Sequence, residues 1–177
     1  MKTIIAAIVL CFAVQCVAQD AQKKAEPVTL KSLLLTQLRE THNQKNWFVS
    51  GKEAMAGMTP EQAAWTDGKN HSVGQLVQHM AFWNSQSLAN FRGEKPPQPG
   101  DNNETFKFDA KNWDAVVKQF DDVMADLEDV VNKADDAKLQ KIAPTVARIA
   151  MHNAYHLGEI VMVRKEQGSW NPETGVK

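Results

Sequence analysis

Apolar residues recur at steps of three or four positions along the chain after residue 28, with polar residues between them. This period places the apolar side chains on one face of a helix. A helix with one apolar face must pack that face against a neighbour, so the pattern predicts an all-α fold. Four long helices are expected, over residues 28–57, 72–92, 112–133 and from just after Pro144 to about Gly168.

Two helix starts can be recognised from their capping residues. Ser72, with Gln75 three positions later, forms a capping box that begins the second long helix. Thr59 followed by Pro60 begins a shorter helical turn that we expect to end at about Ala64.

A long proline-rich link over residues 93–109 separates the second and third long helices, and we expect it to lack regular structure. About 16 residues can extend over some 50 Å, whereas a helix of about 20 residues is roughly 30 Å long. The link can therefore return along a whole helix, which would let helices two and three run parallel. We expect a four-helix bundle with up-down-down-up topology and this link as its crossover.

The first residues have the pattern of an export signal. Lys2 is followed by an uncharged apolar run at 4–14, which is too short for an ordinary membrane-spanning helix. Small residues favour cleavage after Ala18, with Gln19 as the near alternative. A lipoprotein anchored at Cys16 fits less well, because glutamine precedes that cysteine. We expect a periplasmic or secreted protein with no stable membrane insertion after cleavage. The expected parts are a signal peptide (1–18), a flexible leader (19–27), a helical bundle (28–170) and a C-terminal tail (171–177).

Composition narrows the chemistry of the mature chain. Cleavage removes both cysteines, Cys11 and Cys16, so neither a disulfide nor a thiolate ligand is expected. The full chain has a net charge of −1 and no basic block, and loss of Lys2 with the signal makes the charge more negative, which argues against a nucleic-acid partner. The acidic residues of the third long helix are interpreted as a solvated face: Asp121, Asp122, Asp126, Glu128 and Asp129.

Three histidines lie on apolar helical stripes. His152 and His156 are one turn apart in the last long helix, and His79 lies on the second turn of the second long helix. Two imidazoles one turn apart can bind one metal ion, and neutral imidazole is a common zinc ligand. The plain alternative is partly buried histidines that form hydrogen bonds between helices. His71 is expected to be exposed in a loop, and His42 to be exposed or hydrogen-bonded, with a core-facing position as the alternative.

These motifs, in this order, resemble the DinB/YfiT-like family of metal-dependent enzymes. The resemblance rests on His79 in an earlier helix and on the pattern His-x-x-x-His-x-Gly-Glu-Ile at 152–160, and it extends over nearly all of the chain after residue 28. Members of this family are four-helix bundles with a three-histidine metal site. The resemblance therefore implies that His79, His152 and His156 are ligands. It also implies hydrolysis or, as in some relatives, transfer to a low-molecular-weight thiol, which export makes less favourable.

Three histidine ligands leave coordination positions open for water or substrate, as catalytic metal sites do. Zinc or nickel is the expected ion, with other first-row divalent metals as alternatives. Glu159, three residues after His156, is a candidate to orient a ligand or to act as a base. Further candidates for the pocket are Trp83, Tyr155, His42, Asn84 and Gln75. We expect an exported metalloenzyme with a small-molecule substrate. The alternative is a non-catalytic bundle that binds metal or a small ligand. A homodimer through the bundle faces is compatible with both.

Overall fold

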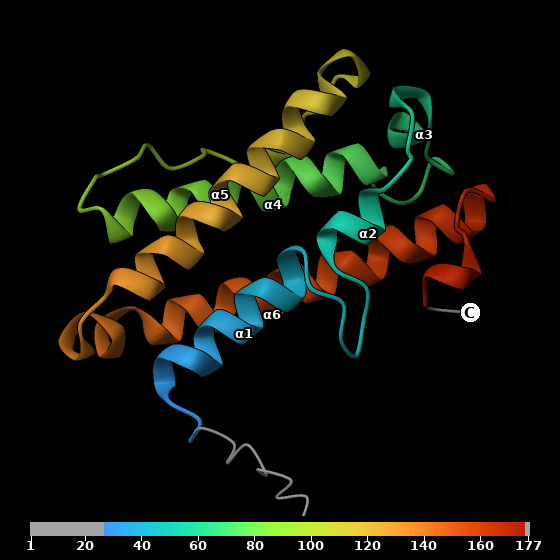
Figure 1. Ribbon diagram of the computed structural model, residues 1–177. Helices are drawn as coiled ribbons and strands as arrows, with labels where there is room; N and C mark the ends of the chain where they lie inside the picture. The colour runs from blue at the N-terminus through green and yellow to red at the C-terminus, as the bar shows by residue number, and fades with distance from the viewer. Residues whose placement is uncertain (1–26, 176–177) are drawn as a thin grey trace, which may run out of the picture.

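The computed structural model describes residues 27–175, so the expected signal peptide and most of the leader lie outside the described residues. Every regular element in that range is helical, which confirms the all-α prediction. The long helices are α1 (Leu30–His42), α4 (Val73–Phe91), α5 (Trp113–Lys133) and α6 (Asp136–Gln167) (Figure 1). The short elements are α2 (Gly51–Met55), α3 (Pro60–Ala64) and three 3₁₀ turns, η1 (Asn102–Phe106), η2 (Ala110–Asn112) and η3 (Pro172–Thr174).

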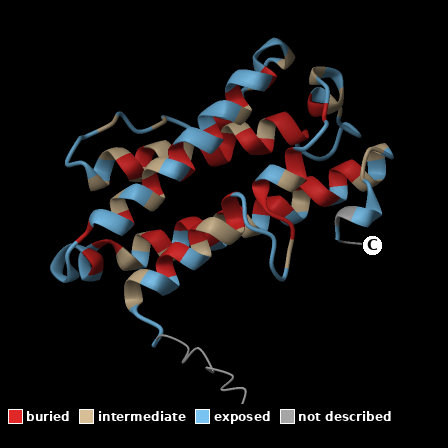
Figure 2. Ribbon diagram, in the orientation of Figure 1, coloured by how far each residue is buried: buried red, intermediate tan, exposed pale blue. Residues whose placement is uncertain are grey.

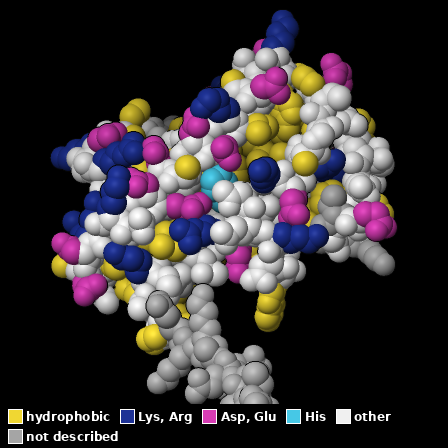
Figure 3. Space-filling view, in the orientation of Figure 1, with side chains coloured by type: hydrophobic (Ala, Val, Ile, Leu, Met, Phe, Trp, Pro, Cys, Tyr) yellow, Lys and Arg dark blue, Asp and Glu magenta, His cyan; other side chains and the backbone are white. Residues whose placement is uncertain are grey.

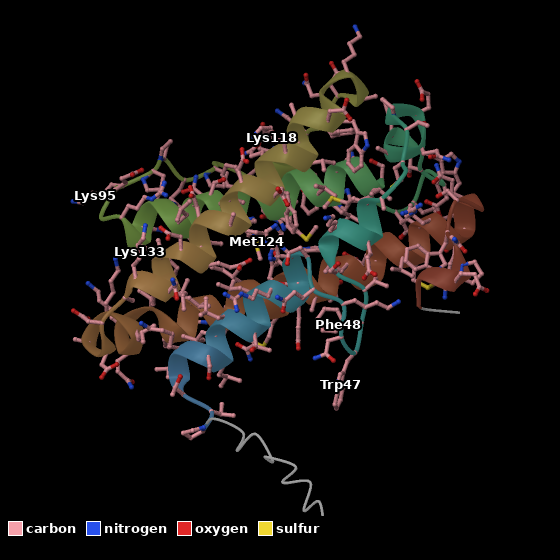
Figure 4. The ribbon with its side chains drawn as sticks, in the orientation of Figure 1. Trp47, Phe48, Lys95, Lys118, Met124 and Lys133 are labelled. Atoms are coloured by element: carbon pink, nitrogen blue, oxygen red, sulfur yellow. The ribbon has the colours of Figure 1, made fainter. Side chains whose placement is uncertain are left out.

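The long helices pack as a bundle around one apolar core. Both α1 and α4 lie against α5 and α6. Buried residues follow the inner sides of these helices and exposed residues their outer sides (Figure 2). Met124 points from α5 into the interior, whereas Lys118 and Lys133 of the same helix point outward (Figure 4). Among residues 27–175, no helix combines the length and apolar character needed to cross a membrane.

Local capping sets the starts of α3 and α4, as the sequence predicts. The Ser72 hydroxyl accepts from the backbone N–H of Gln75, and the Gln75 side chain accepts from the backbone N–H of Ser72 at 2.9 Å. Thr59 and Gln62 form the same reciprocal pair at the start of α3. Each pair satisfies backbone donors that have no partner inside the helix.

The prediction of one helix over residues 28–57 is wrong, because the chain leaves the helical conformation after His42. The segment that follows has four polar residues at 43–46, which offer no apolar face for the core. A new helix, α2, starts only after Ser50, whose hydroxyl forms a capping box with Glu53. Between the two helices, the exposed Trp47 lies at the tip of a loop that extends away from the bundle (Figure 4).

The last long helix begins earlier than predicted, since α6 starts at Asp136 and contains Pro144 in its interior. Proline removes the hydrogen bond to the carbonyl four residues earlier, here that of Gln140. Both residues are exposed, so water can satisfy that carbonyl. Leu139 and Ile142 are buried on the other side of the same turns, and their packing keeps this segment helical.

The link between α4 and α5 is more ordered than predicted, because it contains η1 and η2. Asp101 and Asp109 cap these turns by accepting from backbone N–H groups two residues later. The first part of the link runs back beside α4 (Figure 1). η1 then packs against α4 and buries Thr105 and Phe106. A segment expected to act only as a connection therefore contributes side chains to the interior.

Candidate metal centre

The three histidines predicted as ligands converge between α4 and α6. His79 Nε2 lies 3.1 Å from His152 Nε2, which lies 3.0 Å from His156 Nε2. Two nitrogen lone pairs at such a distance repel each other unless a proton or a cation lies between them. Nitrogens that share one zinc ion with bonds of about 2.0–2.1 Å lie roughly 3–3.5 Å apart. The spacing of these three atoms therefore fits a single ion.

Thr105 fixes the proton of His79 on the ring nitrogen that faces away from the cluster. The Thr105 hydroxyl donates to the Asn102 carbonyl at 2.7 Å, so its oxygen accepts from His79 Nδ1–H at 2.5 Å. The lone pair of His79 is then on Nε2, the atom that meets the other two histidines. Phe106 stacks on the His79 ring with their centroids 4.0 Å apart, which further restricts the ring.

Glu159 does the same for His156. Its carboxylate accepts from His156 Nδ1–H at 2.6 Å, which leaves the lone pair on Nε2. A carboxylate bonded to a histidine in this way fixes the ring and raises its basicity as a metal ligand. Glu159 therefore occupies the orienting position that its spacing from His156 suggested, and its carboxylate is already engaged there.

Burial keeps two of the imidazoles neutral near pH 7. The pKa of His79 falls to about 4, mainly because the ring is buried and to a smaller extent because the His156, His152 and His71 rings lie nearby. The pKa of His152 also falls to about 4, mainly through burial; His156 contributes to the decrease and Glu159 opposes it. Because only neutral imidazole binds a metal ion, the site holds these ligands in the binding form.

A groove of about 630 Å³ opens onto the cluster, and His79 and His152 both line it. Trp83 forms part of its wall, with the ring edge-on to His79 at a centroid distance of 6.5 Å. The indole N–H of Trp83 also donates to the Asn102 side chain at 3.3 Å. A small molecule in this groove would contact the two histidines directly.

Tyr155 lies beside the cluster on its solvent side. Its ring is 65% exposed and approaches His156 edge-on at 5.0 Å. It lines a second cavity, of about 660 Å³, together with Glu159 and His71. His71 is exposed, as predicted, and stacks on Phe106 at 4.0 Å, so Phe106 lies between His71 and His79.

His42 is not part of the cluster. It is buried at the end of α1, where Nδ1 lies 2.7 Å from Glu128 and Nε2 lies 2.8 Å from Asp121. The hydrogen-bonded alternative is therefore the one observed, and two members of the predicted solvated acidic face contact this histidine. His42 lines a separate cavity of about 550 Å³ between α2 and α5. On that side of the molecule hydrophobic side chains gather near α2, among interspersed basic and acidic groups (Figure 3).

Sequence reasoning missed Thr105 and Phe106. Thr105 lies 26 residues after His79, in the link, and no helical spacing relates the two. The available signal was the length of the link itself, since a long connection in a compact domain is often functional. Gln75, another of the candidates, acts in the capping of α4.

The comparisons with known proteins agree with this architecture. The family model of the DinB superfamily matches residues 52–160 of the 177-residue chain, a range that includes His79, His152, His156 and Glu159. No match was found among curated proteins or among solved structures. The match covers more than half of the chain, and it contains the whole histidine cluster on two packed helices. The chain therefore belongs to the DinB superfamily.

Proposed function

We propose that the protein binds one divalent metal ion, zinc or nickel by preference, through His79, His152 and His156. The observation that carries this proposal is the convergence of the three Nε2 atoms. Hydrogen bonds from Nδ1–H to Thr105 and Glu159 support it, because they leave two of these lone pairs directed at one point. Imidazole nitrogen suits both of these ions.

We further propose that this centre is catalytic and hydrolyses a small molecule. A divalent ion held by neutral imidazoles supplies a Lewis acid that lowers the pKa of a bound water or thiol. None of the residues that line the groove is Asp or Glu, and Glu159 is engaged with His156, so the metal ion would have to activate the nucleophile. A water molecule acidified at the metal needs no separate protein base. The same holds for a thiol, so transfer to a thiol is the second candidate.

Metal content of matched variants tests the metal site. After reconstitution with zinc, the wild type and His71→Ala should hold one ion per chain, and His156→Ala should hold far less. His71 is a suitable control because it is exposed and lies near the cluster without offering a ligand atom to it. Equal metal content in all three proteins would mean that the ion is bound elsewhere. No metal in the wild type would mean that the three histidines are core residues and not ligands.

Turnover tests the catalytic proposal separately. The zinc-loaded protein should hydrolyse members of an ester and amide panel, and His156→Ala should lose that activity. Activity only when a low-molecular-weight thiol is supplied would favour the transferase. A protein that holds zinc and turns over none of these substrates would be a non-catalytic metal-binding bundle.

We also propose that residues 1–18 direct export and that the mature protein begins at Gln19 or Asp20. The support is the charged start, the short apolar run and the small residues before the cleavage site. Intact-mass analysis of the periplasmic or secreted form tests this proposal. Retention of Met1, or a lipid on Cys16, would contradict it.

The order of the long helices supports a further structural proposal, the up-down-down-up topology with α4 and α5 parallel. α4 packs against α5, and the link between them turns back beside α4 (Figure 1). A crystal structure with these two helices as a tight antiparallel hairpin would contradict it.

A further inference from the structure

We infer that the substrate of this centre carries a carboxylate, and that Arg148 binds it. The inference rests on the proposed metal centre and adds the class of molecule that it accepts. Arg148 lies one turn before His152 on α6, so their Cβ atoms are about 5–6 Å apart. It lines the same groove as His79 and His152. Arg148 and the two histidines therefore border the same space, which a small molecule could occupy.

Arg148 differs from the other arginines in having no partner among the described residues. Arg39 and Arg92 pair with acidic residues of α5, and Arg164 donates to two backbone carbonyls. An unpaired guanidinium at the mouth of a groove is free to bind an anion. Its planar donors match a carboxylate, which it can bind through two parallel hydrogen bonds.

The charge of the groove favours an anion. Arg148 is its only formally charged lining residue, and the polar residues beside it are neutral: Asn84, Ser87, Asn102 and Thr145. A divalent ion at the cluster would add to this positive charge, so the groove favours an anion, and the planar guanidinium matches the two oxygens of a carboxylate. The second cavity suits an anion less well, because two carboxylates, Glu159 and Glu166, line it with a single lysine, Lys69.

Two thiol probes that differ in charge test the inference. Calorimetry would compare 3-mercaptopropionate with its neutral amide, 3-mercaptopropionamide, on the zinc-loaded protein. The wild type should bind the carboxylate at least about fivefold more tightly, a modest factor because Arg148 is exposed. Arg148→Gln should bring the two affinities together, and Arg148→Lys should retain part of the preference. The preference should also narrow at high salt.

Arg92→Gln is the matched control, since it removes the same charge from another exposed site and should keep the preference. Zinc content is measured separately for each variant and should be equal. A wild type that holds zinc and binds both probes equally, or an Arg148→Gln variant that keeps the preference, would overturn the inference and leave the metal centre standing. A wild type without zinc would overturn the metal centre instead. In that case the two probes are titrated into metal-free protein. If the carboxylate probe shows no preference that depends on Arg148, the inference is contradicted.

Discussion

Replacement of Thr105 by valine is expected to weaken metal binding, although Thr105 is not a ligand. Valine keeps the shape of the buried side chain and removes the oxygen that accepts from His79 Nδ1–H at 2.5 Å. In the variant, Nδ1–H loses its partner, and the ring can move its proton to Nε2, the atom that faces the cluster. Metal binding must then reverse that change and bury an unsatisfied N–H, at a cost of about 1–3 kcal/mol.

That cost corresponds to a metal affinity roughly tenfold to a hundredfold weaker, the range expected when a partner of a ligating histidine is lost. Competition with a chromophoric chelator at pH 7 measures it. Thr41→Val is the matched control, because Thr41 is equally buried but bonds only to backbone carbonyls within α1. A Thr105→Val protein that binds zinc within twofold of wild type would refute the argument that this hydrogen bond prepares the site.

In metal-free protein, stability should fall between pH 7 and pH 5, by about 1–2 kcal/mol for each of His79 and His152. The pKa of each ring is about 4 in the folded protein and 6.5 in the unfolded chain, so this stability is complete above pH 6.5 and is lost as the pH falls toward 4. Urea denaturation at the two pH values measures it, and a higher midpoint at pH 5 than at pH 7 would contradict the burial argument. Gly74→Ala should destabilise by about 1–3 kcal/mol, because its Cβ would lie 2.2 Å from the Phe108 ring. Gly158→Ala should stabilise the protein by about 0.5–1 kcal/mol, because the space around Gly158 is open. The melting temperatures of the two variants measure both effects, and equal shifts from wild type would contradict this reasoning.

Features set by neighbours in the chain could be determined from the sequence. The capping box at Ser72 and the Thr59–Pro60 start depend only on residues within one helical turn. The end of α6 is equally local, since Gly168 adopts the left-handed conformation that ends a helix. His152 and His156 share a face of α6 because of the helical repeat alone. Two of the three proposed ligand positions, and the acidic partner of one of them, could therefore be predicted from their spacing alone.

Features that depend on contacts between distant segments were decided only by the tertiary structure. The interior position of Pro144 is held by the burial of its neighbours, which outweighs one lost hydrogen bond. His42 is buried because two carboxylates of α5 bond to both of its ring nitrogens. Thr105 reaches His79 only because the link folds back onto α4. None of these contacts produces a periodic pattern in the sequence. Each joins residues whose separation along the chain depends on how the helices pack and not on the repeat of one helix.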